Sequence, residues 1–129
     1  MPRRSKSLLR RYLEARRRAL AERPRVIREF LEELAQVLGD RASIIVFGGR
    51  AVVGIDSTEP RDLDLLIVIS DNDDPGSIEE LIYRLRPRDL PLDLIIARRS
   101  ELQNSIAKQM LRTRIVVHDP LHVEETLND

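Results

Sequence analysis

Cysteine and tryptophan are absent from this 129-residue chain, and other aromatic residues are scarce, with two Phe and two Tyr. Without cysteine there are no disulfides and no thiolate metal sites, so any bound metal must be held by oxygen or imidazole. The scarcity of aromatic side chains leaves few surfaces on which bases could stack. This argues against a reader of single-stranded nucleic acid.

Long hydrophobic runs are missing as well. No apolar stretch approaches the roughly 18 residues of a membrane-spanning helix, and the start of the chain, Met1-Pro2-Arg3-Arg4, does not resemble a secretory signal. We therefore expect a soluble, globular protein of the cytoplasm. The many charged residues and the few Asn, Gln and Met weakly indicate a thermophilic source.

The net charge of zero conceals an uneven distribution of charge. Residues 1–28 contain eleven basic side chains against two acidic ones, Glu14 and Glu22. Leucine, alanine and tyrosine recur at helical spacing in this segment, which predicts an amphipathic helix with an arginine-rich face. Its simplest interpretation is a solvated helix packed on the core. The alternatives are a surface that binds an acidic protein partner or RNA.

Periodicity and turn signals predict an α/β fold, with a small mixed β-sheet flanked by helices in a single domain over 1–129. The expected organisation is an N-terminal helical pair over 1–40, a core over 41–120 and a short tail over 121–129. The predicted strands lie near 43–47, 63–69, 91–97 and 114–118, and the predicted helices near 6–21, 24–38, 77–85 and 100–110.

Four of these helix boundaries rest on specific signals. Pro24 is predicted to begin the second helix, because proline suits the first helical turn, and Gly39 is predicted to end it. The later helices are predicted to begin at capping boxes formed by Ser77 with Glu80 and by Ser100 with Gln103.

Two glycines interrupt the chain directly after the first predicted strand. The β-branched run over 43–47 ends abruptly at Gly48 and Gly49. A helix that begins just past Gly49 would point its unpaired N–H groups and its positive dipole end into the turn, where they attract an anion such as a phosphate chain. This turn is the first half of a predicted nucleotide site.

Two acids at the start of the next predicted strand supply the second half. Asp62 and Asp64 lie at i and i+2, so their side chains project from one face, about 7 Å apart. No lysine or arginine follows on that strand, and two unpaired carboxylates there are costly to desolvate. Hard oxygen ligands of this kind suit Mg²⁺, which takes its remaining ligands from water and substrate phosphates.

A third acid, Asp93, interrupts the short apolar strand predicted over 91–97. Taken alone, it is as well explained as a strand-end aspartate in a turn. Beside Asp62 and Asp64 it becomes a candidate third ligand. An ordinary unit of strands and helices, with acids at strand ends and glycines in turns, is the alternative interpretation of the whole pattern.

In order and spacing, these motifs over 43–97 resemble the minimal nucleotidyltransferases, small members of the DNA polymerase beta-like superfamily. That family has a strand ending in Gly-Ser, a short helix with a further Gly, an Asp-x-Asp strand and a third acid. Here Gly48 and Gly49 hold the Gly-Ser place, Gly54 the further glycine, and Asp62, Asp64 and Asp93 the acids.

Two positions depart from the family pattern. Gly49 replaces a serine whose hydroxyl contacts the terminal phosphates, and Arg61 replaces a serine that commonly precedes the first acid. Arg61 is a surface residue or a cover for a phosphate. The missing hydroxyl at position 49 bears on the strength of catalysis.

The resemblance implies transfer of a nucleoside monophosphate, AMP in the first instance, from an NTP to an acceptor hydroxyl, with two Mg²⁺ ions. Asp62, Asp64 and Asp93 are the implied catalytic residues and metal ligands, and Asp93 is a candidate to take the acceptor proton. Gly48, Gly49 and Arg50 are the implied nucleotide-binding residues, with Arg50 neutralising the charge of the departing pyrophosphate.

The acceptor is not fixed by the residues. Stand-alone members of the family are often antitoxins that adenylylate a tyrosine of a helical HEPN toxin, so the resemblance implies such a partner. Transfer to a small molecule is an alternative within the same chemistry. A catalytically weak or inactive module that binds a nucleotide or a partner is an alternative outside it. RNA binding through the basic N-terminal helix and oligomerisation remain open.

Overall fold

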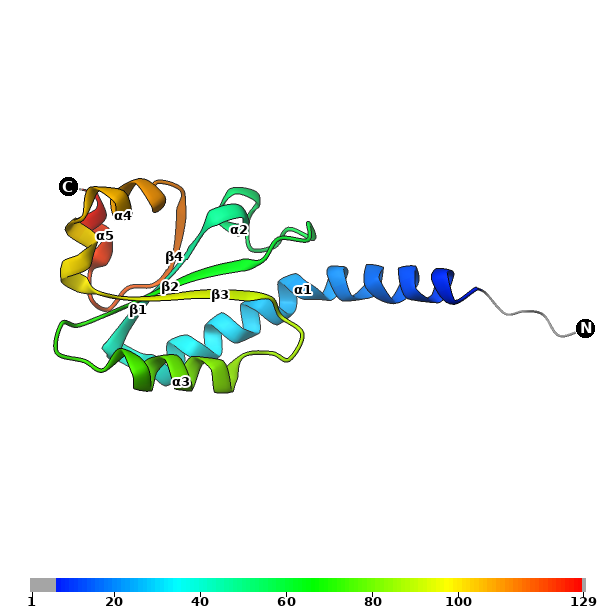
Figure 1. Cartoon of the computed structure of the whole chain (residues 1–129), viewed down its shortest axis with the longest axis horizontal. Helices are drawn as coiled ribbons and strands as arrows, with labels where there is room; N and C mark the ends of the chain where they lie inside the picture. Colours follow the sequence, from blue (N-terminus) through cyan, green and yellow to red (C-terminus); the bar gives the residue numbers. More distant parts are fainter. Residues whose placement is uncertain (1–6, 129) are drawn as a thin grey trace, which may run out of the picture.

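The computed structural model describes residues 7–128, which form one four-stranded sheet with helices packed around it (Figure 1). The predicted mixed sheet flanked by helices is confirmed. The elements in chain order are α1 (Leu8–Leu38), the 3₁₀ turn η1 (Gly39–Arg41), β1 (Ala42–Phe47), α2 (Gly48–Val53), β2 (Leu63–Ile69), α3 (Pro75–Leu85), β3 (Leu92–Arg98), the 3₁₀ turn η2 (Arg99–Gln103), α4 (Ser105–Met110), β4 (Arg114–His118) and α5 (Val123–Leu127).

The sheet has the strand order β3-β2-β1-β4 and is mixed. β1 pairs antiparallel with both β2 and β4, whereas β2 and β3 run parallel and are joined by α3. In this register Phe47, the last residue of β1, lies beside Asp64, and Asp64 lies beside Asp93. The start of β2, the start of β3 and the end of β1 therefore meet at one end of the sheet.

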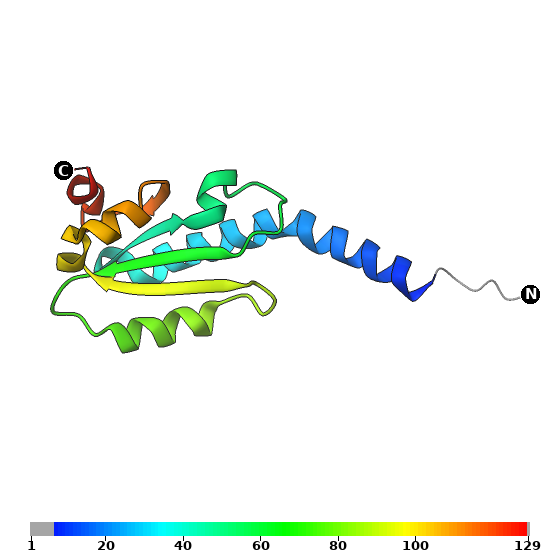
Figure 2. The same cartoon turned by 45° about the horizontal axis from the view of Figure 1, so that its top comes forward.

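Alternation along the strands separates two apolar clusters. Side chains such as Leu65 and Ile67 face α1 and α3, which close one face of the sheet. α1 contributes Phe30 and Leu34 to this cluster. Leu66 and Val68, which alternate with these residues along β2, face the opposite side of the sheet. The segments η2, α4 and α5 cover that side through residues such as Leu102, Leu111 and Val123. The two views show α3 and the C-terminal half of α1 on one side and α4 and α5 on the other (Figures 1 and 2).

The N-terminal helical pair is a single helix, so the prediction of two helices was wrong. α1 runs from Leu8 to Leu38 with Pro24 inside it, and Ser7 caps its start by accepting the Arg10 N–H at 3.1 Å. Proline removes one helical hydrogen bond, but the apolar pattern continues in phase on both sides of it, and burial of the C-terminal half supports the helix. The end was predicted correctly, at Gly39 with φ 56°.

Both predicted capping boxes were also wrong. α3 begins earlier, at Pro75, because the Asp74 carboxylate accepts the Gly76 N–H at 3.1 Å. α4 begins after Asn104, whose side-chain oxygen accepts the Ile106 N–H at 2.7 Å, while Ser100 and Gln103 lie in η2.

The C-terminal segment, predicted as a short tail, contains a helix. α5 buries Val123 and Leu127, and the Asp119 carboxylate anchors its start by accepting the Val123 N–H at 2.8 Å and the Glu124 N–H at 3.1 Å. The predicted start of the first helix at residue 6, and the basic residues Arg3, Arg4 and Lys6, lie outside the described residues. Between residues 7 and 128, no helix combines the length and the apolar character needed to cross a membrane.

Candidate active site

The glycine turn lies at the acid end of the sheet and fits closely around one of the predicted acids. Gly48 has φ +69°, and a Cβ atom there would lie 2.0 Å from Oδ2 of Asp64. Only glycine accommodates both the left-handed backbone and this contact. The backbone N–H of the next residue, Gly49, lies close enough to the Asp64 carboxylate to lower its pKa. The turn and the first acid strand are thus joined directly.

The three predicted acids come together at this end of the sheet. Asp64 and Asp93 are register partners on the parallel strands β2 and β3, and Asp62 lies one residue before β2. Burial raises the pKa of the Asp64 carboxyl, and the charges of Asp93 and Asp62 raise it further, against the lowering effect of the Gly49 N–H. Asp64 is half-buried, while Asp62 and Asp93 are exposed.

The acids fit a divalent cation only in part. Among residues 7–128, none of the ion pairs includes Asp62, Asp64 or Asp93, so their mutual repulsion is not neutralised by a protein cation. No group of three His, Cys, Asp or Glu side chains in this part of the chain is arranged so that it could hold a metal ion. Such a donor set suits a hard cation that draws further ligands from water and phosphate.

The Arg50 side chain is not available to a nucleotide, which corrects the predicted use of its charge. Its guanidinium is fully buried and donates to the carbonyl oxygens of Ser57, Glu59 and Arg61 at 2.6, 3.1 and 2.8 Å. Its Nε atom is buried without a hydrogen-bond partner within the described residues. Arg50 therefore shapes the loop that leads into Asp62, and only its backbone N–H at the start of α2 still faces the predicted phosphate turn.

Arg61 takes a position that the sequence left open. Its side chain lies across Gly49, with Cδ 3.3 Å from where a Cβ atom of residue 49 would be. Because Arg50 holds the Arg61 carbonyl, the backbone of this arginine is fixed beside the turn. The two departures from the family pattern are thus in contact with each other, a juxtaposition that no sequence signal showed.

Positive charge surrounds the same loop. Burial lowers the pKa of the Arg50 guanidinium, and the nearby charges of Arg23 and Arg61 lower it further, while Glu59 raises it. Arg23 and Arg61 thus lie close enough to Arg50 for their charges to act on it, and of the three arginines Arg61 is the one whose side chain lies across the glycine turn.

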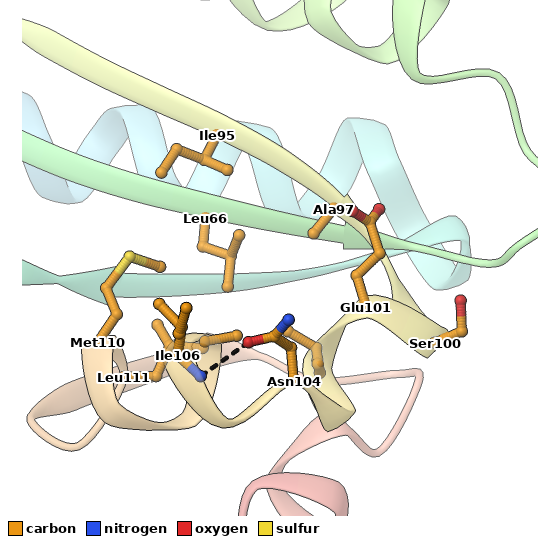
Figure 3. A pocket seen from close by; sticks show the side chains of 11 residues that line it. Leu66, Ile95, Ala97, Ser100, Glu101, Asn104, Ile106, Met110 and Leu111 are labelled. Carbon is orange, nitrogen blue, oxygen red and sulfur yellow. Dashed lines mark hydrogen bonds between the residues drawn. The ribbon is translucent and has the colours of Figure 1, made fainter.

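A large cavity lies away from the acids. About 510 Å³ in volume, it opens between the sheet and the η2–α4 segment (Figure 3). Strand alternation places Asp64 and Asp93 on the same face of the sheet. Leu66 and Ile95 line the cavity, each two residues beyond an acid on the same strand. Its remaining lining is mostly apolar, and the Glu101 carboxylate at its edge accepts the Arg98 N–H at 2.8 Å.

Comparison with solved structures finds a protein of the same architecture. A crystal structure from Sulfolobus solfataricus, described as a "putative nucleotidyltransferase", matches with a TM-score of 0.51 over 88% of this chain and 90% of that one. The fold is a nucleotidyltransferase fold. Sequence identity is 16%, so the likeness concerns the arrangement of the chain. No family model matches the sequence, and the search of the curated proteins found no match.

The nucleotidyltransferase fold brings together the predicted site residues Gly48, Gly49, Asp62, Asp64 and Asp93. It separates from them only the Arg50 guanidinium, which lies within the loop. The predicted metal and catalytic roles of the acids remain predictions.

Proposed function

We propose that this protein is a nucleotidyltransferase that moves a nucleoside monophosphate, most simply AMP, from an NTP to an acceptor hydroxyl. The observation that carries the proposal is the contact between the Gly48–Gly49 turn and Asp64, with Asp93 in register beside it. A phosphate turn and a pair of carboxylates are what the reaction requires side by side. The nucleotidyltransferase fold supports the proposal.

In this proposal the glycine turn binds the β- and γ-phosphates through backbone N–H groups at the start of α2. The Arg61 guanidinium supplies the positive charge that we first expected from Arg50, because its side chain lies across Gly49. It takes the place of the family serine as a ligand of the terminal phosphates. Arg50 is a positioning residue, since it holds the Arg61 carbonyl.

Asp62 and Asp64, with Asp93 completing the set, would hold Mg²⁺, which neutralises the phosphates and activates the acceptor hydroxyl. The acceptor oxygen forms a new bond to the α-phosphorus as the bond from that phosphorus to the bridging oxygen breaks. Pyrophosphate then leaves. Asp93 takes the proton of the acceptor hydroxyl, a role that its exposure at the edge strand β3 permits.

The acceptor in this proposal is carried by a protein, namely a tyrosine of a HEPN-type toxin that the transfer silences. Two of the three acids are exposed at the end of the sheet, so a side chain on the surface of another protein can reach them. A small-molecule acceptor would need further enclosing surface around the same acids.

A second candidate is a module that binds a nucleotide or a partner without turnover. The observation that favours it is the glycine at position 49, which lacks the hydroxyl of the family serine. In this case Arg61 would still attract phosphates, while transfer would be slow or absent. The two candidates differ in one measurable step, the appearance of labelled product.

The deciding experiment incubates the protein with ATP labelled at the α-phosphate, Mg²⁺ and a lysate of its source cells. The Asp62→Asn/Asp64→Asn variant tests the acids, and Asp89→Asn, an exposed aspartate of the neighbouring loop, is the matched control. We expect label on a protein with wild type and Asp89→Asn, and none with the double variant.

Other outcomes separate the alternatives. Label on a small molecule or on RNA would keep the chemistry and replace the acceptor. Saturable ATP binding without transfer would support the non-catalytic module. Equal labelling by the double variant would contradict the assigned acids.

A further inference from the structure

The N-terminal part of α1 repeats the apolar pattern of its buried part. Eighteen residues make about five turns of α-helix, so positions that far apart point in the same direction. Four of the five core positions of α1 recur as apolar residues 18 positions earlier. The pairs are Leu9 with Ile27, Tyr12 with Phe30, Leu13 with Leu31, and Leu20 with Leu38, while Arg16 stands opposite Leu34.

Apart from Leu20, which is half-buried, this repeated stripe is exposed within the described residues. We call residues 8–20 the arm. It extends past the end of the sheet in both views (Figures 1 and 2). Its side chains Leu9, Tyr12 and Leu13 are 65, 59 and 53% exposed, whereas Ile27 and Leu34 are fully buried. A lone helix of this length is marginal in water, so a covering surface would stabilise the arm.

The arm leaves the domain beside the acids. Thr58, in the loop that leads to Asp62, borders a hollow together with Leu13 and Leu20. On the other side, the loop that leads to Asp93 borders a second hollow with Ala19 and neighbouring residues of α1. Because the stripe points in the same direction as the buried part, it faces the space beyond the acid end of the sheet.

Charge selects the kind of surface that fits the stripe. Residues 8–23 carry six arginines and two glutamates. Two arms packed on each other would place these arginines together at a cost, and RNA would pair with the arginines while leaving the leucines uncovered. An apolar surface with an acidic rim satisfies both the leucines and the arginines.

We propose that the arm is the docking surface for an acidic protein, which packs an amphipathic helix along Leu9, Tyr12 and Leu13. Resting on the proposed function, this partner is the protein that carries the acceptor hydroxyl. Docking on the arm holds the partner directly in front of Asp62, Asp64 and Asp93. The domain then needs no binding surface of its own for the acceptor.

A synthetic helix tests the surface without reference to catalysis. The probe is a peptide of about three heptads with leucine in the seam and glutamate at the flanking positions, which keep the peptide from pairing with itself. Its binding to the full chain is measured by fluorescence anisotropy. The comparison peptide has lysine in place of each glutamate, and Asp62→Asn/Asp64→Asn protein should bind the probe as wild type does.

We expect Leu9→Gln/Leu13→Gln to weaken binding of the glutamate peptide at least tenfold, because glutamine keeps helix propensity while removing apolar surface. Arg16→Glu/Arg17→Glu should weaken it similarly, without removing any leucine. Val37→Gln, an exposed apolar position of α1 outside the arm, is the control and should leave binding unchanged. Circular dichroism checks that each variant keeps its helix.

Three results would overturn the proposal. Equal binding of the lysine peptide would remove the charge argument. Light scattering that shows a dimer lost in Leu9→Gln/Leu13→Gln would assign the stripe to a second copy of the chain. Binding of a poly(U) probe that falls steeply with salt and is abolished by Arg16→Glu/Arg17→Glu, with no peptide binding, would assign the arm to RNA.

The link to transfer has its own readout. A photo-crosslinking amino acid at position 13 should attach the same acidic polypeptide that receives label from α-labelled ATP. If labelling fails everywhere while the glutamate peptide still binds, the proposed function fails and the docking surface stands. If labelling of that polypeptide is unchanged in Leu9→Gln/Leu13→Gln, the docking proposal is wrong and the proposed function stands.

Discussion

The two faces of the sheet are built from the same strands and differ in how completely they are closed. On one face the long helices α1 and α3 cover residues such as Leu65 and Ile67 fully. On the other face only short helices and η2 pack, and the same strands carry the acids at one end and the cavity beside Leu66. Alternation along β2 thus puts the tightly packed core residues on one face of the sheet and the candidate catalytic acid Asp64 on the other.

This difference shows that an unpaired carboxylate is tolerated where packing is incomplete. The pKa of Asp64 is raised by burial and by Asp93 and Asp62, so the site is electrostatically unfavourable when the acids are ionised. The closed face can offset such a cost because its core does not depend on the acids. We expect substitutions on the two faces to have separable effects on stability and activity.

The largest difference is expected from matched leucine truncations. Leu34→Ala on the closed face should lower the free energy of unfolding by about 3 kcal/mol, because it leaves a cavity that α1 cannot fill. Leu66→Ala should cost less, about 2 kcal/mol, since it borders an existing cavity that water can enter. Urea unfolding of both variants measures the difference. Equal losses would mean that the open face is as tightly packed as the closed one.

An intermediate effect is expected at the glycine turn. Gly48→Ala should destabilise the protein by about 1–2 kcal/mol, because of its positive φ, and should abolish transfer by displacing the Asp64 carboxylate. Gly49→Ser should change stability by less than about 0.5 kcal/mol, since only the flexible Arg61 side chain must move, and should raise the transfer rate. Calorimetry and the labelling assay check the pair. Full activity in Gly48→Ala would contradict the proposed site.

The smallest effect is expected in the dependence of stability on pH. The pKa of Asp64 is raised in the folded state, so ionisation of this carboxyl opposes folding. The protonated carboxyl contributes stability below its ordinary pKa, and this contribution is lost as the pH rises through the folded-state pKa. Asp64→Asn should therefore be more stable than wild type at pH 7, by no more than about 1 kcal/mol, and equal to it near pH 3.

Asp119 provides the opposite case. Burial raises its pKa, but the N–H groups of Val123 and Glu124 and the Ser43 hydroxyl lower it more, so the net shift is downward. The ionised Asp119 carboxylate therefore contributes stability to the fold above its ordinary pKa, and this stability is lost as the pH falls through the folded-state pKa. Thermal unfolding of Asp64→Asn and Asp119→Asn between pH 3 and pH 7 should show trends of opposite sign.

The strands could be predicted from the sequence because each depends on local pattern, whereas the meeting of the glycine turn with the three acids was implied by the family resemblance and depends on strand pairing. β2 was predicted with its observed bounds, since an apolar run is confined between Asp62 and Ser70. The α3 start was missed because two capping signals compete within four residues, and Asp74-Pro75 prevails. Pro24 was misread because the signal for a first helical turn is the same whether or not another helix leads into it.

The roles of the arginines could not be predicted, because they depend on the path of a loop. Three carbonyl groups converge on Arg50 only once the segment between α2 and β2 is folded. Likewise Arg61 reaches Gly49 across 12 positions of sequence. Residue type and spacing do not reveal such contacts, so the charge of Arg50, which follows the glycine turn, was assigned from the sequence to the phosphates.

A bend at Pro24 would change where the N-terminal end of α1 points. Leu8 lies 16 residues beyond Pro24, or about 24 Å along the helix axis. Proline leaves one helical carbonyl without its donor, which is where a helix bends most easily, and a bend of about 20° there would move Leu8 by about 8 Å. The reach of the arm is therefore governed by an angle close to the domain, and whatever covers the stripe also sets that angle.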